Sequence, residues 1–356
     1  MAPRVECEGS TADRRRLSTR QWLADKSNTT IDVVDAVAKQ YPTRISGFLR
    51  KRIDEGTYSI SAARQYLPDA RELLTTPGWL VDPCNERNYQ ETSSVLRKYP
   101  NRAAIILTHQ CLVYCRYCFR KDFVGQEGND IQDAEWRKAV EFVRQDPTIN
   151  DILLSGGDPL VLSNTRLIPI LAEFVSIPHL HTIRIHSRAL SVAPSRFDDA
   201  LLGFLRDHQK FWYYAHMNHP DDVDHPQVKA TVRKLLGAGV PVLNQAVILK
   251  GVNDDPEVMA DLFMKCYANK VVPYNLYALD KVMGASHFMV PNEQIADIVV
   301  RLSRLPGPAQ PTLVLVDRQN LKRRLNCDTP RDQIVSWLVS LTAETDEIAQ
   351  CLVGEK

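Results

Sequence analysis

The chain has 356 residues, of which 44% are hydrophobic and 24% charged, as in ordinary globular proteins. Its formal net charge is only +1, so no overall charge excess favours binding to nucleic acid or to a membrane surface. No run approaches the roughly 20 apolar residues that span a bilayer, and the start MAPRVECEGSTADRRRLSTR lacks the apolar stretch of a secretory signal. We therefore expect a cytoplasmic protein whose partners are neither nucleic acids nor membranes.

Residues 1–96 are expected to form an N-terminal extension of helices and irregular segments. Apolar residues three to four positions apart in TIDVVDAVAKQYPTRISGFLRKRI and SISAARQYLPDARELL are typical of amphipathic helices. Pro77 and Gly78 then end the helical pattern, and VDPCNERNYQETSSVLRKYPNR shows no sustained periodicity. The last part of the extension is therefore predicted to be a long irregular connection.

Residues 97–320 show a different pattern, in which short apolar runs alternate with amphipathic stretches. The predicted strands are AAIIL, DILL, TIRI, WYYA, VLNQAVIL, YNLYA and TLVLV, and helix-like stretches such as DAEWRKAVEFVRQD lie between them. This alternation is typical of parallel βα units, in either a TIM-type barrel or a doubly wound sheet. Residues 321–356 are expected to form a C-terminal loop and a short helical tail.

Polar clusters follow the predicted strands and favour one of these two folds. The cysteines follow AAIIL, SGGDP follows DILL, HSR follows TIRI, HMNHP follows WYYA, LDK follows YNLYA, and Asp317 follows TLVLV. Functional residues of a βα barrel collect at the carboxyl ends of its strands. Polar clusters after so many strands favour a barrel with one site over a doubly wound sheet with one crevice.

Three of the eight cysteines lie close together, at Cys111, Cys115 and Cys118, whereas the other five are scattered. In an intracellular chain such clustering indicates metal or redox chemistry, and the scattered cysteines are expected to be free thiols. The spacing C-x3-C-x2-C suits an iron–sulfur cluster in which three thiolates bind three irons and the fourth iron stays open. The alternative is a zinc site that His109 completes as the fourth ligand.

The cysteine motif, with Tyr117 before its last cysteine, resembles the signature of radical S-adenosylmethionine (SAM) enzymes. The segments KYPNR, SGGDPL, IRIHSR, HMNHP, GVPVLNQAVILKGVND and LDKVMGASHF follow in an order that resembles the lysine 2,3-aminomutase family, over about residues 40–320. That family includes a shorter branch that acts on a lysine of a translation factor. The resemblance implies a partial (β/α)6 TIM-type barrel of the radical SAM type. It also implies a 4Fe–4S cluster with SAM on its open iron, an electron donor such as a flavodoxin or ferredoxin, and a homo-oligomer as one possible assembly.

The resemblance also assigns roles to single residues. The three cysteines would hold the 4Fe–4S cluster, and SAM would contact Ser155, Gly156, Gly157, Asp158, Ser187 and His216. For Gly156 and Gly157 the structural alternative is a tight turn with Asp158 as a helix cap. Arg120 would bind the substrate carboxylate, and Asp280 and Asp317 its distal ammonium. One cation and two anions describe a free basic amino acid, either lysine or arginine.

Members of this family also use pyridoxal phosphate (PLP). The positions that would contact it are Lys98, Tyr99, Arg102 and Gln245, with Lys322 as the catalytic lysine that carries it. The chain departs from the family at this lysine, because no glycine run follows Asp317, position 324 is arginine, and Lys322 lies two residues early. Either a short deletion restores Lys322 to the role, or the loop has lost it.

These features lead to one main hypothesis and three alternatives. The main hypothesis is a PLP-dependent 2,3-aminomutase, an isomerase that makes a β-amino acid from free lysine or arginine. The missing glycine run motivates a PLP-independent radical oxidation, desaturation or epimerisation of the same amino acids. The third reading is modification of a lysine on a translation factor, which the Asp317 match disfavours. The fourth is a metal-binding protein without catalytic activity, which the intact cysteine and SGGDP motifs disfavour.

Overall fold

The computed structural model describes residues 11–126, 131–316 and 322–340, and its centre is one sheet of ten strands. The strands lie side by side in chain order, with β1 and β10 at the two edges. Neighbours from β3 to β9 pair in parallel, whereas β1, β2 and β10 pair antiparallel to their neighbours. The strands are β1 (Gln90–Thr92), β2 (Val95–Tyr99), β3 (Arg102–Thr108), β4 (Asp151–Gly156), β5 (Thr182–Ser187), β6 (Phe211–Ala215), β7 (Val242–Val247), β8 (Val272–Tyr277), β9 (Thr312–Val316) and β10 (Lys322–Leu325).

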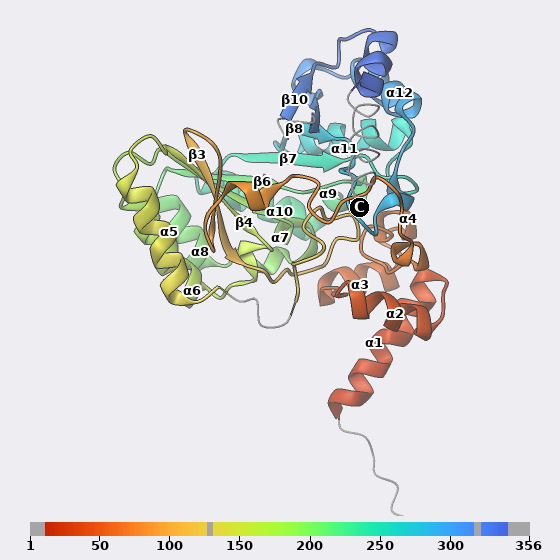
Figure 1. The fold of residues 1–356 in the computed structure, drawn as a ribbon, viewed down its shortest axis with the longest axis horizontal. Coiled ribbons are helices and arrows are strands. Elements are labelled where there is room, and N and C mark those ends of the chain that lie inside the picture. The colour runs from red at the N-terminus through yellow and green to blue at the C-terminus, as the bar shows by residue number, and fades with distance from the viewer. Residues whose placement is uncertain (1–10, 127–130, 317–321, 341–356) are drawn as a thin grey trace, which may run out of the picture.

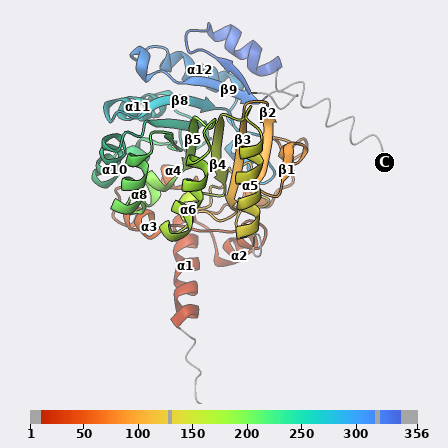
Figure 2. The ribbon, with the colours of Figure 1, turned by 90° about the vertical axis from the view of Figure 1, so that its left-hand side faces the viewer.

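A main helix follows each parallel strand from β3 to β8 and covers the outer face of the curved sheet (Figures 1 and 2). These helices are α5 (Asp133–Gln145), α6 (Asn164–Val175), α8 (Asp199–Asp207), α10 (Pro226–Gly237), α11 (Pro256–Ala268) and α12 (Asn292–Leu302). Shorter helices are η3 (Pro159–Val161), α7 (Ala189–Val192), η4 (Pro194–Arg196), α9 (Pro220–Val223), η5 (Ser286–Phe288) and η6 (Gly307–Ala309). The predicted partial barrel of six βα units is confirmed. Within the described ranges, none of the helices is both long and apolar enough to cross a membrane.

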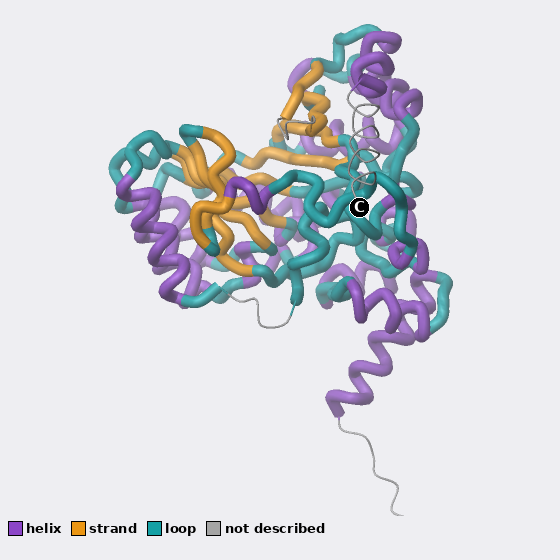
Figure 3. Tube along the Cα trace, viewed as in Figure 1, coloured by secondary structure: helices purple, strands orange, loops and turns teal. Residues whose placement is uncertain are grey.

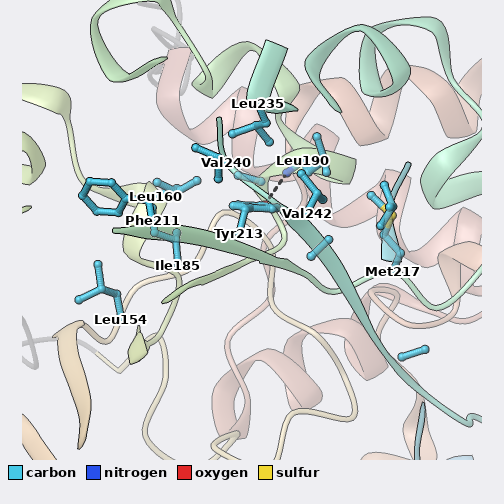
Figure 4. Packing of buried hydrophobic residues seen from close by; sticks show 14 of the residues in the cluster. Leu154, Leu160, Ile185, Leu190, Phe211, Tyr213, Met217, Leu235, Val240 and Val242 are labelled. Carbon is cyan, nitrogen blue, oxygen red and sulfur yellow. Dashed lines mark hydrogen bonds between the residues drawn. The ribbon is translucent and has the colours of Figure 1, made fainter. Parts of the chain in front are cut away.

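The largest hydrophobic core lies between the sheet and these outer helices. Ile185 of β5 is buried there beside Tyr213 of β6, whose hydroxyl oxygen accepts a hydrogen bond from the Leu190 backbone nitrogen at 3.2 Å (Figure 4). Successive side chains of a strand point to opposite faces of the sheet. Arg184 and His186, the neighbours of Ile185, therefore point into the barrel interior, which is where a polar site can form.

The N-terminal helices form a second hydrophobic core beside the loops at the carboxyl ends of the strands (Figures 1 and 3). They are α1 (Thr11–Ser27), α2 (Ile31–Gln40), α3 (Gly47–Asp54), α4 (Ile60–Ala63) and the short η1 (Ala70–Leu73). Trp22, Leu49 and Tyr66 are buried in this core together with Val113 of the cysteine loop. The helices thus pack directly against the loop that carries the predicted iron ligands.

Two segments that the sequence predicted to be irregular contain regular structure. The connection before β3 holds η2 (Glu86–Tyr89), β1 and β2, and the predicted C-terminal loop begins with β10, in which Lys322 pairs with Val316. All three strands are short and lie at the ends of the sheet, and in β2 only Val95 is buried. Such strands lack the alternation that a sequence pattern needs. Residues 331–340 are helical as expected, and the remainder of the predicted tail lies outside the described residues.

Candidate active site

The cysteine loop begins at the end of β3 and is held by the glycines that follow β4. The backbone nitrogen of Gly157 donates to the Thr108 oxygen at 2.7 Å, and that of Asp158 donates to the Gln110 oxygen at 2.8 Å. A Cβ at position 157 would lie 2.2 Å from the Gln110 oxygen, and Gly156 has a φ of +104°. Only glycine satisfies both conditions, because it has no Cβ and tolerates positive φ. The SGGD turn therefore shapes the cysteine loop through backbone contact.

Cys111, Cys115 and Cys118 gather in this loop and lie close enough for their charges to interact. Burial raises the pKa of each thiol, and the neighbouring cysteines raise the pKa of Cys111 and Cys118 further, to about 12 for Cys118. Three adjacent thiolates are therefore unfavourable unless a cation or metal cluster shares the site. No three His, Cys, Asp or Glu side chains surround one point as ligands of a single ion within the described ranges. In an iron–sulfur cluster each thiolate binds a different iron.

A buried ion cluster ties the cysteine loop to the N-terminal helices. The Glu72 carboxylate accepts from Arg116 Nη2 at 2.5 Å and from Lys121 Nζ at 2.6 Å, and the Glu72 and Arg116 side chains are at most 1% exposed. Lys121 Nζ also donates to the Gly284 oxygen at 2.7 Å, beyond β8. Glu72 was not predicted as a site residue. Its two cationic partners flank Cys118 and Cys115, so it positions the loop that carries the thiols.

Arg120 lies against the SGGD turn but is already paired with a carboxylate. Its Nη1 donates to Ser155 Oγ at 2.8 Å and to the Gly156 oxygen at 3.1 Å. Its Nε and Nη2 each donate to Glu86 at 2.6 Å, which is the bidentate geometry that an amino-acid carboxylate would also use. The structure thus brings together Arg120, expected at the substrate, and Ser155, expected at SAM. It adds Glu86 from η2, in the segment that we had predicted to be irregular.

Asp158 and Ser187 meet at the edge shared by β4 and β5. The Asp158 carboxylate accepts from the backbone nitrogens of Leu160 at 2.9 Å and Arg188 at 3.0 Å, and Ser187 lowers its pKa through a side-chain hydrogen bond. Because burial outweighs these hydrogen bonds, the pKa of Asp158 is still raised. Asp158 therefore caps η3, which is the structural alternative, and also joins two loops of the site.

Comparison with known proteins identifies the family. Residues 105–263 match the family model described as the radical SAM superfamily. The L-lysine 2,3-aminomutase of Clostridium subterminale is 32% identical over 306 residues, covering 85% of this chain and 73% of that protein. The L-lysine 2,3-aminomutase of Escherichia coli K12 is 35% identical over 268 residues, covering 75% of this chain and 78% of that protein. The chain belongs to the lysine 2,3-aminomutase family. It is a radical SAM enzyme, which implies a 4Fe–4S cluster and SAM as cofactors.

The surroundings of the cysteines fit a radical SAM enzyme. Arg188 lies beside Cys115 and partly offsets the effect of burial, which raises the pKa of that thiol. The guanidinium donates to Gln65 Oε1 at 2.9 Å and to the Tyr66 hydroxyl at 2.6 Å, while its Nη2 is buried and has no hydrogen-bond partner within the described part of the chain. An anionic cluster or a carboxylate would satisfy this donor. Both the thiols and their cationic neighbour therefore suit the cofactors of this family.

A second group of predicted residues gathers in the barrel interior of this family member. Lys322 Nζ donates to the Tyr277 hydroxyl at 3.1 Å, and that hydroxyl donates to Gln245 Oε1 at 3.0 Å. Burial raises the pKa of Asp280 to about 6, and of the neighbouring cations Lys322 lowers it most. Burial, Arg188 and Lys322 lower the pKa of His216 to about 3. Gln245, Lys322, Asp280 and His216 thus lie close enough to one another to interact.

The remaining predicted residues are placed less centrally. Arg102 stacks on Tyr99 at 3.9 Å, at the amino end of β3, whereas the cysteines follow its carboxyl end. Lys98 lies over the Tyr89 ring at 5.2 Å and lowers the pKa of Asp280, so its charge reaches the second group. Asp317 lies outside the described residues.

Several residues of the site carried too weak a sequence signal to be predicted. Glu72 and Glu86 come from the N-terminal extension, far in sequence from the arginines that they pair with. Tyr277 ends β8, and His186 is part of the quoted segment IRIHSR but was assigned no role. The one usable signal was position, because His186 and Tyr277 lie at the carboxyl ends of parallel strands.

Proposed function

We propose that this radical SAM enzyme is a PLP-dependent 2,3-aminomutase that converts a free basic amino acid into its β-isomer. The observation that carries the proposal is the position of the Lys322 ammonium beside Tyr277. Although Lys322 lies two residues early in the sequence, β10 pairs with β9 and brings its Nζ within 3.1 Å of the Tyr277 hydroxyl, which in turn donates to Gln245; the Lys322 residue itself is exposed. A lysine at this place supports the short-deletion interpretation over the loss of the cofactor lysine.

Residues of this chain have separate roles in the proposed reaction. When bound, SAM and the cluster would supply a carbon radical that removes a hydrogen atom from the substrate, and PLP would supply the carbonyl carbon that holds the amine nitrogen while it migrates. Burial lowers the pKa of Lys322, but Tyr277 and Asp280 outweigh it and keep the lysine an ammonium. The Tyr277 hydroxyl is the adjacent group that holds this ammonium until the lysine gives up its proton.

The substrate ends are held by charge. Arg120 stands at the SGGD turn beside the cysteine loop, and Asp280 lies near Lys322. An amino acid that extends from the first to the second places its carboxylate at a guanidinium and its distal cation at a carboxylate. Asp317 is proposed as the second carboxylate, as in the sequence-based prediction. Both lysine and arginine satisfy this pattern.

The experiment is product analysis under anaerobic conditions. The cluster-loaded protein receives reductant, SAM and labelled lysine or arginine, with and without PLP. We expect a β-amino acid isomer of one of them, formed only with PLP. Product that forms equally without PLP, or an oxidised or epimerised amino acid, overturns the proposal in favour of the PLP-independent reaction. Turnover of a lysine on a translation factor, with no free amino acid consumed, would support protein modification instead.

Variants of Lys322 test its role separately. Lys322→Arg keeps the charge but forms no covalent link to a carbonyl, so we expect loss of product and loss of the mass increase that borohydride fixes on the PLP-loaded wild type. The matched control is Lys250→Arg at an exposed lysine, which should leave both unchanged. Arg324 lies on the same face of β10, where its Nη2 donates to Tyr274 at 3.1 Å. Adding Arg324→Lys to Lys322→Ala should therefore not restore activity.

We further propose that a small one-electron carrier such as a flavodoxin or ferredoxin reduces the cluster, and that the enzyme works in the cytoplasm. Outside the cysteine loop, Cys84, Cys266 and Cys327 are free thiols, which is consistent with a reducing compartment. Replacing the chemical reductant with a reduced ferredoxin or flavodoxin should sustain formation of 5'-deoxyadenosine.

A further inference from the structure

We propose that His186 is a ligand-binding residue whose Nε2–H donates a hydrogen bond to an oxyanion bound in the barrel interior. The oxyanion is either the carboxylate of the amino acid or the phosphate of the cofactor, and only this choice rests on the proposed function. No role was assigned to His186 from its sequence motif. Its place on β5 turns its ring into the interior, opposite the buried Ile185.

The hydrogen-bond chain in the interior assigns the proton of His186. The Tyr277 hydroxyl oxygen accepts from Lys322 Nζ at 3.1 Å and from Asn275 Nδ2 at 2.8 Å. Lys322 can only donate, and the Asn275 amide is oriented with its Nδ2 toward Tyr277, so the single hydroxyl proton of Tyr277 goes to Gln245 Oε1, at 3.0 Å. The amide oxygen of Gln245 therefore faces Tyr277, and its amide nitrogen faces the histidine.

Gln245 Nε2 lies 3.1 Å from His186 Nδ1 and can only donate to it. Nδ1 must then be the ring nitrogen without a proton. Burial is the largest of the causes that hold the pKa of His186 well below its usual range, so the ring is neutral and carries its one proton on Nε2. A chain of hydrogen bonds that starts at the Lys322 ammonium thus fixes the tautomer of a histidine on another strand.

Nε2 is the end of this chain and has no protein partner. It is buried and lacks a hydrogen-bond acceptor within the described ranges. The ring itself is held in place by stacking on Tyr214, with centroids 4.6 Å apart, and the His216 ring lies 5.8 Å away. A buried donor without an acceptor is costly, so a rigidly held one indicates the position of a ligand atom.

The charges around His186 favour an anionic acceptor. After burial and His216, the cations Arg184, Lys322 and Arg120 lower its pKa. Arg184 is paired with Asp151 and Arg120 with Glu86, whereas the Lys322 ammonium contacts the uncharged hydroxyl of Tyr277. The charge of Lys322 near this neutral N–H donor favours a carboxylate or phosphate oxygen over an uncharged acceptor.

The first test compares two variants of the full-length, cluster-loaded protein. The amide of His186→Asn reaches the position of Nδ1 and can still meet Gln245, whereas the amide of His186→Gln extends toward the position of Nε2 and keeps a donor there. One arm titrates PLP, and the other titrates lysine or arginine, with and without PLP and in the absence of reductant. We expect His186→Asn to lower the affinity for one of the two ligands about tenfold or more. The affinities of His186→Gln should stay within about threefold of those of the wild type.

The arms also identify the oxyanion. If only the affinity for PLP falls, the oxyanion is the phosphate of PLP. If only the affinity for the amino acid falls, the oxyanion is the amino-acid carboxylate. Affinities that His186→Asn leaves unchanged in both arms overturn the proposal. If wild type binds no PLP but His186→Asn weakens amino-acid binding, the aminomutase assignment fails while the role of His186 stands.

The second test reads the proton in the wild-type protein. Nuclear magnetic resonance of nitrogen-15-labelled histidine should show a neutral ring with its proton on Nε2 at pH 7, assigned as the signal missing from either variant. Addition of PLP or amino acid should shift the Nε2 resonance. A proton on Nδ1, or an Nε2 resonance that responds to neither ligand, overturns the proposal.

Discussion

Replacing Glu72 by glutamine should destabilise both the fold and the cysteine loop. The Glu72 side chain is 0% exposed and accepts from Arg116 and Lys121, which are 1% and 4% exposed. Glutamine keeps the shape but removes the charge, so two cations remain buried without a counter-ion. Breaking a buried ion pair in this way costs about 3–5 kcal/mol. At about 2 °C per kcal/mol for a chain of this size, Tm should fall by roughly 6–10 °C.

The pH dependence of this loss follows from Lys121. Burial lowers the pKa of Lys121 to about 8, although Glu72 raises it. Without Glu72 that pKa falls further, so Lys121 sheds its proton nearer neutral pH and relieves part of the repulsion. The unfolded chain then binds more protons than the folded variant, and the stability of the variant rises with pH. The difference in Tm between Glu72→Gln and wild type should therefore be largest at pH 6 and smaller at pH 8.

Thermal unfolding and the iron content after anaerobic reconstitution measure the two effects. Glu55→Gln is the matched control, because the Glu55 side chain is 53% exposed and its Oε1 lies 3.7 Å from Lys51 Nζ at the surface. Its Tm should change by about 1 °C or less. If Glu72→Gln keeps the wild-type Tm and full iron content, the buried ion cluster does not position the cysteine loop, and the reasoning is refuted.

Three further predictions concern the site itself. If the amino-acid carboxylate takes over the donors of Arg120 that Glu86 now occupies, Glu86→Gln should lower the amino-acid KM several-fold, whereas a raised KM would show that Glu86 only positions the arginine. Because the pKa of Asp280 is about 6, its charge is lost below that pH, and the amino-acid KM should rise as pH falls from 7 to 5; a flat profile contradicts this. Gly157→Ala should abolish 5'-deoxyadenosine formation, since its Cβ would lie 2.2 Å from a backbone oxygen of the cysteine loop. Gly203→Ala, with nothing within 4 Å, should leave formation unchanged, and equal activity of the two variants would refute the packing argument.

The predicted barrel and the predicted thiol cluster depended on residues that are neighbours in sequence. The spacing of Cys111, Cys115 and Cys118 and the glycines of SGGDP report chemistry that one loop performs, so a short pattern contains the information. Buried strands and amphipathic helices likewise show their periodicity locally. The edge strands β1 and β10 and the neighbouring β2 escaped prediction because they have few buried residues and so show little alternation.

By itself, then, the sequence determined the fold class, the thiol cluster and the family to which they point. Tertiary structure alone decided what depends on distant segments meeting: the pairing of Glu86 with Arg120, the return of Lys322 to Tyr277, and the tautomer of His186. The physical reason is that a hydrogen bond or ion pair depends on distances of a few ångströms between side chains. Sequence separation carries no information on such distances until β10 has paired with β9 and η2 has packed beside the cysteine loop.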